Sequence, residues 1–295
     1  MPLTLSRFVR DAVSRLEKCY SGDEARSIVL GLCGDFLGTE RFEHVINPDY
    51  PISMENETRL EEAMRRLENM EPLQYVTGKA YFYGMELYVD KAVLIPRQET
   101  EELCRLALDS FRTSGNRSHG AGNLPGSGLR ILDVCTGSGC IAWAMSANLP
   151  GAAVFGCDIS YPALGIASSQ KTGARCPVFF QNDILSGDFP VTGDFDAILS
   201  NPPYVTSSEK RLMSRNVLDY EPHSALFVTD EDPLAFYRAL AGMASAHLKP
   251  EGFGIVEINE AFGDGCRGLF MDYGFSNSVI IKDLNGKDRF CRFSR

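Results

Sequence analysis

The residues with the clearest chemical potential are Asn201-Pro202-Pro203-Tyr204, which follow an apolar segment at 195–200. The prolines fix φ and have no backbone N–H, so the carbonyls here are free to accept hydrogen bonds. A planar amide –NH₂ has two N–H donors, which the Asn201 side-chain oxygen and the Pro202 carbonyl can accept while Tyr204 stacks on the plane. A nitrogen held in this way is oriented for attack on an activated methyl group, and orientation supplies up to about 7–11 kcal/mol in ideal cases.

We therefore predict that Asn201, Pro202 and Tyr204 are catalytic and that all four residues, Pro203 included, bind the substrate. Ligands of open α/β sheets bind at the carboxyl ends of strands, which is where this segment is expected. The alternative interpretation is a rigid turn with no chemical role.

A glycine-rich turn at 133–140 follows the first apolar strand pattern and opens a helix. Gly137 and Gly139 allow the backbone to turn sharply and approach a ligand, and the helix N-terminus presents free N–H groups. Asp158 ends the next predicted strand, where a carboxylate can accept hydrogen bonds from both ribose hydroxyls of an adenosine. The predicted cofactor-binding residues are Asp133, Val134, Cys135, Thr136, Gly137, Gly139, Asp158, Asp183, Ile184 and Asn201.

Two cofactors could use this turn. A dinucleotide site needs three glycines in the pattern G-x-G-x-x-G, but Ala142 stands at the third position. Asp133 would repel a pyrophosphate, whereas it would suit the ammonium group of a methionine moiety, so we predict S-adenosylmethionine. An NAD-type oxidoreductase is the less favoured alternative, because no hydride-transfer His or Tyr/Lys pair is evident. Asp133 could also be only a strand-end or helix-capping residue.

The charge balance bears on the substrate. The chain has a formal net charge of −10. A protein that binds naked nucleic acid usually has a basic surface to neutralise phosphates, so we expect no direct nucleic-acid substrate and favour a protein or small molecule.

Metal and membrane sites are not indicated. The nine cysteines form no C-x-x-C pair, and the four histidines show no metal-ligand spacing, so we predict no metal. No apolar run approaches the roughly 18–20 residues that span a bilayer, and the N-terminus has no signal-type apolar core. We expect a cytoplasmic protein.

The first 75 residues have helical periodicity. Apolar residues recur at helix-like spacing in 5–16 and 57–70, and a break at 21–24 can cap a helix between them. Residues 81–90 are rich in aromatic and β-forming residues around Gly84, which predicts a hairpin. No catalytic cluster is evident before residue 75.

From about residue 93 strands alternate with helices, which predicts a mostly parallel sheet covered on both faces. The predicted strands are 129–134, 153–157, 178–181, 195–200, 252–258, 278–281 and 289–293. The predicted helices are 99–111, 141–148, 162–170 and 233–247. Residues 112–128 are rich in Gly, Ser and Asn and are expected to form a mobile loop.

These motifs together resemble a known family, the peptide-chain release factor N5-glutamine methyltransferases (the PrmC/HemK family). The resemblance is carried by the segment at 201–204 and by four further motifs. These are Pro72-Leu73-Gln74-Tyr75-Val76-Thr77-Gly78, Leu94-Ile95-Pro96-Arg97-Gln98-Glu99-Thr100-Glu101, Tyr220-Glu221-Pro222 with Ala225-Leu226, and Asp283-Leu284-Asn285-Gly286-Lys287-Asp288-Arg289.

The resemblance implies methyl transfer from S-adenosylmethionine to the glutamine side-chain nitrogen of the Gly-Gly-Gln motif in release factors, which would be the protein partners. It implies a Rossmann-like class I methyltransferase sheet with an antiparallel final strand. It also implies an N-terminal helical domain that helps to hold the release factor. The expected boundaries are 1–75 for this domain, 76–95 for a hairpin linker and 96–295 for the methyltransferase domain.

Four positions in three segments depart from the usual family pattern. Gln98 stands where Pro is usual, Val134-Cys135 where Leu-Gly is usual, and Asn259 where Gly is usual. None of these changes removes a residue to which chemistry is assigned.

Two further functions compete with this reading. A nucleic-acid amino-methyltransferase acting on adenine N6 or guanine N2 would share the segment at 201–204 but would need basic grooves and base flipping. A non-catalytic partner protein could use the same fold without transferring a methyl group.

Overall fold

A computed structural model describes residues 3–113 and 124–295 of the chain. The chain forms two compact units. Unit 1 comprises residues 1–79 and 213–220, and unit 2 comprises residues 80–212 and 221–295. Within the described residues, no helix is both long and apolar enough to cross a membrane.

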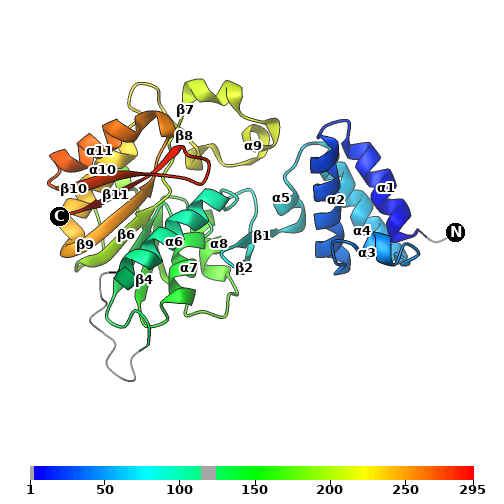
Figure 1. Cartoon of the computed structure of the whole chain (residues 1–295), viewed down its shortest axis with the longest axis horizontal. Coiled ribbons are helices and arrows are strands. Elements are labelled where there is room, and N and C mark those ends of the chain that lie inside the picture. Colours follow the sequence, from blue (N-terminus) through cyan, green and yellow to red (C-terminus); the bar gives the residue numbers. More distant parts are fainter. Residues whose placement is uncertain (1–2, 114–123) are drawn as a thin grey trace. The chain divides into compact units, whose positions relative to one another are not determined.

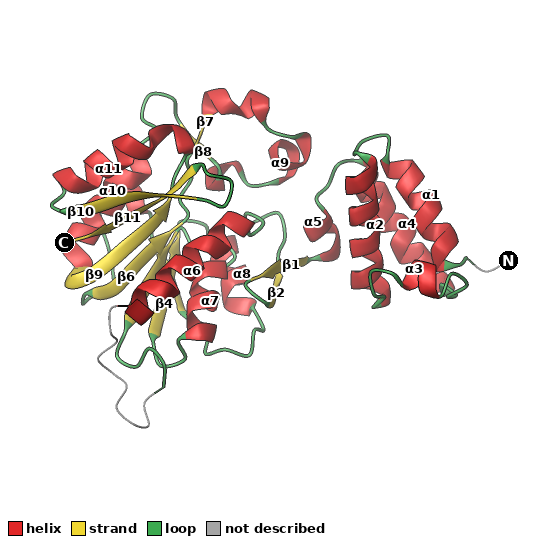
Figure 2. Ribbon diagram, in the orientation of Figure 1, coloured by secondary structure: helices red, strands yellow, loops and turns green. Residues whose placement is uncertain are grey.

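Unit 1 is helical, as its apolar spacing predicts (Figure 2). Its helices are α1 (Leu5–Leu16), α2 (Gly22–Leu37), α3 (Glu43–Ile46), α4 (Met54–Glu68), α5 (Leu73–Thr77) and α9 (Arg215–Tyr220). Ser21 and Ser53 cap α2 and α4, since each hydroxyl accepts a hydrogen bond from a backbone N–H of the first turn. The helix α9 is far away in sequence, and the Tyr220 hydroxyl donates a 2.8 Å hydrogen bond to the Asn69 carbonyl.

Unit 2 is built on a seven-stranded sheet in the order β10-β11-β9-β6-β3-β4-β5 (Figure 1). Its strands are β3 (Arg130–Val134), β4 (Ala153–Asp158), β5 (Val178–Gln181), β6 (Phe195–Ser200), β9 (Leu248–Glu257), β10 (Asn277–Lys282) and β11 (Asp288–Ser294). The pairs from β5 to β9 are parallel, whereas β11 is antiparallel to both of its neighbours. The sequence prediction of a mostly parallel sheet with an antiparallel end is confirmed.

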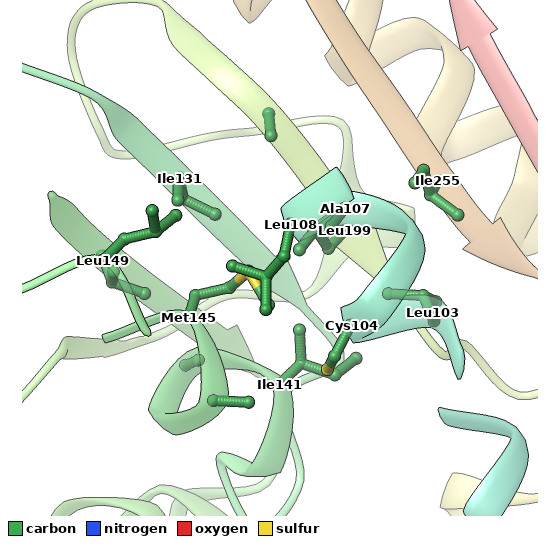
Figure 3. Packing of buried hydrophobic residues seen from close by; sticks show 14 of the residues in the cluster. Leu103, Cys104, Ala107, Leu108, Ile131, Ile141, Met145, Leu149, Leu199 and Ile255 are labelled. Atoms are coloured by element: carbon green, nitrogen blue, oxygen red, sulfur yellow. The ribbon is translucent and has the colours of Figure 1, made fainter. Parts of the chain in front are cut away.

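The helices of unit 2 cover both faces of this sheet, because the central strands are apolar on both sides. Ile131 and Leu132 are neighbours on β3 and point into different clusters. Ile131 packs with α6 (Gln98–Thr113) and α7 (Cys140–Asn148), as Figure 3 shows. Leu132 packs with α10 (Ala235–His247) and α11 (Gly263–Asp272). The helix α8 (Tyr161–Ser169) lies beside β4 and β5.

Smaller elements complete unit 2. The predicted hairpin is present as β1 (Lys79–Phe82) and β2 (Met85–Tyr88). A second small sheet pairs β7 (Val205–Thr206) with β8 (Phe227–Val228). Short 3₁₀ turns lie at η1 (Ile184–Ser186), η2 (Ser207–Leu212), η3 (His223–Ala225) and η4 (Glu260–Phe262).

The structure differs from the sequence prediction in a few places. The strand expected at 252–258 begins earlier, at Leu248, and α11 was not predicted. In the glycine-rich segment expected as a loop at 112–128, residues 112 and 113 end α6, and residues 114–123 lie outside the described residues.

One glycine of β9 allows the aromatic core of unit 2 to close. Phe293 is fully buried and stacks on Phe270 at 4.0 Å between ring centroids. Its ring lies against Gly254, where an added Cβ would come within 2.0 Å of Phe293 Cζ. The stack therefore requires a residue without a side chain at position 254.

We predict that Gly254→Ala lowers the free energy of unfolding by about 1–3 kcal/mol or more, because it overpacks this stack. Gly268→Ala is the matched control. Gly268 lies inside α11 with no heavy atom within 4 Å of an added Cβ, so Ala should be neutral or stabilise by up to about 1 kcal/mol. Urea denaturation of both variants measures the difference, and equal stabilities would contradict the prediction.

Candidate active site

A cavity of about 240 Å³ lies at the carboxyl ends of β3, β4, β5 and β6. It is lined by most of the residues predicted from the sequence, namely Val134, Cys135, Thr136, Gly137, Asp158, Asp183, Ile184, Asn201 and Pro203. Asp133, Gly139, Pro202 and Tyr204 do not line it. The strand ends therefore bring together segments that are far apart in the chain, as the predicted topology requires.

The glycine-rich turn is fixed by a carboxylate of the neighbouring strand. Asp158 Oδ2 accepts a 2.9 Å hydrogen bond from the Gly137 N–H, and its Oδ1 accepts one of 2.9 Å from the Ser160 N–H. Burial raises the pKa of Asp158, while these backbone donors oppose the rise. One carboxylate thus connects the loop after β3 with the loop after β4.

Three residues of the turn, Cys135, Gly137 and Gly139, have left-handed backbone, and the surroundings of Gly139 and Cys135 differ. Gly139, at φ 81°, packs so closely that an added Cβ would lie 3.0–3.1 Å from Trp143, Ala167 and Phe179. This glycine therefore serves helix packing rather than close approach to a ligand. Cys135, one of the departures named in the sequence, has φ 58° and lines the cavity, so its Cβ occupies space beside the site at some conformational cost.

Asp133 lies beneath the turn instead of in the cavity wall. It is fully buried, and its Oδ2 accepts hydrogen bonds from Thr136 Oγ1 at 2.5 Å and from the Ala142 N–H at 3.1 Å. Its Oδ1 has no hydrogen-bond partner among the described residues. These contacts favour a role in positioning the turn and the start of α7, which was the simpler of the two interpretations of the sequence.

The segment 201–204, which we call the amide clamp, is anchored on a buried carboxylate. Asn201 Nδ2 donates a 3.0 Å hydrogen bond to Thr100 Oγ1, whose own hydroxyl donates to Glu257 Oε2 at 2.9 Å. The Tyr204 hydroxyl donates to Glu257 Oε1 at 2.9 Å. The Tyr204 hydroxyl is therefore engaged inside the protein, and the stacking of its ring on a substrate stays a prediction. Sequence reasoning assigned no role to Thr100 or Glu257.

Asn259 supports the other side of the amide clamp. It is 5% exposed, and its Nδ2 donates to the Tyr204 carbonyl at 3.2 Å and to Glu209 Oε2 at 2.9 Å. Glu209 in turn accepts hydrogen bonds from the backbone and hydroxyl of Thr206. Asn259, one of the departures named in the sequence, thus fixes the backbone that follows the clamp.

An ion pair joins two further loops at the cavity. Arg97 Nη2 lies 2.5 Å from Glu221 Oε1, and Glu221 Oε2 accepts a 3.2 Å hydrogen bond from the Ile95 N–H. The Glu221 carboxylate is 1% exposed, and the residues beside the pair, Pro96 and Pro222, line the cavity. The sequence indicated both segments only as family motifs. The signal for an ion pair was a basic residue next to one proline, Arg97, and an acidic residue next to another, Glu221.

The chemistry of the lining fits an adenosyl group. Asp158 offers a partly buried carboxylate to ribose hydroxyls. Asn182 Oδ1 is a buried acceptor in this lining with no partner among the described residues, and it matches the N–H donors of an adenine amine. Ile159 and Leu185, both half exposed, add apolar surface for a flat ring. These features agree with the cofactor chosen from the sequence.

The chain matches two family models. Residues 8–78 match the PrmC N-terminal domain, and residues 122–226 match the methyltransferase small domain. A release factor glutamine methyltransferase of Bacteroides thetaiotaomicron is 38% identical over 281 residues, which cover 95% of this chain and 96% of that protein. Enzymes with the same description from Flavobacterium psychrophilum and Koribacter versatilis are each 36% identical, and the matches cover 95% and 97% of both chains, respectively.

The buried carboxylate beneath the turn predicts a pH effect on stability. Burial raises the pKa of Asp133 to about 7, from an ordinary value of 3.8. Between these values the folded state retains a proton that the unfolded state releases, so the contribution of Asp133 to stability is full below pH 3.8 and is lost as the pH rises towards 7.

We therefore expect Asp133→Asn, which cannot titrate, to gain stability relative to the unmodified protein as the pH rises from about 4 to about 7. Urea denaturation of both proteins across this range, without ligand, measures the difference in the free energy of unfolding. A difference that stays constant with pH would contradict the assignment.

Proposed function

Since the chain belongs to the family of release factor glutamine methyltransferases, we propose that it methylates a glutamine side-chain nitrogen of peptide-chain release factors. The target is the glutamine of their Gly-Gly-Gln motif. The protein is an S-adenosylmethionine-dependent methyltransferase. Residues 1–75 serve substrate recognition, 76–95 form a hairpin linker, 96–295 carry the methyltransferase, and the enzyme works in the cytoplasm with release factors as its partners.

The cofactor, when bound, supplies a methyl group on a sulfonium, which is an activated leaving group. The residues that would hold it are those of the cavity. Asp158 would accept the ribose hydroxyls, Asn182 Oδ1 would accept from the adenine amine, and the turn at 135–137 would line the methionine side. Asp133 would keep this turn in place from below.

The observation that carries the proposal is the hydrogen-bonded state of Asn201. Its Nδ2 is already bound to Thr100, so its Oδ1 remains the atom that can accept a hydrogen bond from a substrate. With the Pro202 carbonyl, this oxygen would accept both N–H groups of a glutamine amide. An amide nitrogen is a weak nucleophile, because its lone pair is delocalised into the carbonyl. The contribution of Asn201 and Pro202 is therefore to orient this nitrogen, and the proton can leave after transfer.

Mass spectrometry of a bacterial-type release factor tests the proposal directly. We expect the Gly-Gly-Gln peptide to gain the mass of one methyl group after incubation with the enzyme and S-adenosylmethionine. A parallel incubation with labelled cofactor and DNA or RNA tests the adenine N6 and guanine N2 alternative. Label that appears only in nucleic acid would refute the proposed substrate.

We predict that Asn201→Ala lowers the rate of methyl transfer by about 10²–10³-fold, because the substrate amide loses an oriented acceptor. Binding of S-adenosylhomocysteine, measured by calorimetry, should stay within about threefold of that of the unmodified enzyme, a change of less than 1 kcal/mol. Asn201→Asp is a useful companion variant, since it keeps an acceptor of the same shape but loses the Nδ2 donor to Thr100. Near-normal transfer by Asn201→Ala would show that the clamp assignment is wrong.

A further inference from the structure

One buried carboxylate anchors both ends of the amide clamp. Glu257 ends β9 and is 1% exposed. Its Oε2 accepts the Thr100 hydroxyl, which continues to Asn201, while its Oε1 accepts the Tyr204 hydroxyl directly. The first and last residues of the clamp are therefore fixed by the two oxygens of a single side chain.

Hydrogen bonds connect Glu257 to Thr100 and Thr100 to Asn201. The direction of the bond to Glu257 fixes the direction of the bond to Asn201. A carboxylate has no proton to donate, so the Thr100 hydroxyl must donate its single proton to Glu257. The Thr100 oxygen can then act only as an acceptor towards Asn201. Of the two ends of the Asn201 amide, only the –NH₂ group can donate to it, so Oδ1 must face the other way.

We propose that Glu257, acting through Thr100, sets the orientation of the Asn201 amide, so that an acceptor rather than a donor faces the substrate nitrogen. Glu257 and Thr100 are positioning residues in this scheme, because both act through the Asn201 amide; Thr100 also lines the cavity, whereas Glu257 does not. The inference rests on the proposed function, because it explains how the clamp selects a substrate –NH₂ group. The reversed amide would present N–H donors to N–H donors and would repel the substrate.

The surroundings of Glu257 favour a role beyond packing. A carboxylate at 1% exposure costs free energy that an apolar side chain of the same size would not. The guanidinium of Arg289 interacts favourably with Glu257, and Arg289 is itself held by Asp283 at 3.1 Å. Burial raises the pKa of Glu257, whereas the Thr100 and Tyr204 hydroxyls and the charge of Arg289 on β11 oppose this rise and favour the charged form. A buried ion so supported fixes hydrogen-bond direction, which an apolar contact cannot do.

The test compares variants of nearly identical shape. Thr100→Val removes the hydroxyl, and Thr100→Ser keeps it. Glu257→Gln can donate to Thr100, which allows the Thr100 proton to turn towards Asn201 and the amide to reverse. We expect Thr100→Val and Glu257→Gln to lower kcat for methylation of a release factor by about 10–100-fold, whereas Thr100→Ser stays within about threefold of the unmodified enzyme.

The effect should fall on kcat rather than on KM or cofactor affinity. Because these variants change the orientation of the clamp amide and not the rest of the substrate surface, we expect the KM for a release factor to change by less than about threefold. The Kd for S-adenosylhomocysteine should be equally insensitive. Ser110→Ala, on the same helix α6, removes a hydroxyl that donates to the Leu106 carbonyl and serves as the control with normal activity.

The double variant Thr100→Val with Glu257→Gln gives a second readout. Both residues act through the same hydrogen bonds. We therefore expect the kcat of the double variant to be no lower than that of the less active single variant. Additive losses would overturn the proposal, as would normal kcat in both single variants or a loss in Thr100→Ser equal to that in Thr100→Val. If the unmodified enzyme did not methylate release factors at all, the proposed function would fail instead, which separates the two outcomes.

Discussion

The site depends on one geometric constraint, which is that β6, β3, β4 and β5 run parallel and end at the same edge of the sheet. The register pairs Val134 with Cys157 on one side and with Ser200 on the other, so the loops after these strands begin level with one another. Asp158 helps to shape the cavity at these strand ends, because its two carboxylate oxygens accept hydrogen bonds from the backbone of the loops after β3 and β4. Each residue given a chemical role depends on that edge.

Local patterns in the sequence were enough to place the residues that follow strands. Asp158 and Asn201 come directly after apolar segments, and strand-end position alone predicts that they meet at the cavity, which they line. The position of Asp133 at the glycine-rich turn could be predicted, but its full burial outside the cavity lining could not. Whether a carboxylate at a strand end faces a ligand or lies beneath the turn depends on backbone angles that one residue type does not specify.

The parts that sequence reasoning missed depend on contacts between distant residues. Thr100 and Glu257 are 157 positions apart, and nothing in either neighbourhood indicates that one hydroxyl joins them to Asn201. The helix α11 contains Gly263, Gly265 and Gly268, which give it low intrinsic helix propensity. It forms because Phe270 packs onto Phe293 of the last strand, and this tertiary contact overrides the local preference.

The helical unit has a consequence for how the chain folds during synthesis. Its last piece, α9, comes from residues 213–220, and Tyr220 bonds to the carbonyl of Asn69. The helices α1 to α5 are therefore synthesised long before α9, the last helix of their unit. Most of the sheet, from β3 to β6, is translated in the interval. The buried core of the N-terminal helices lies within residues 5–76, so it can form early, and α9 adds its contact only after most of the sheet has been translated.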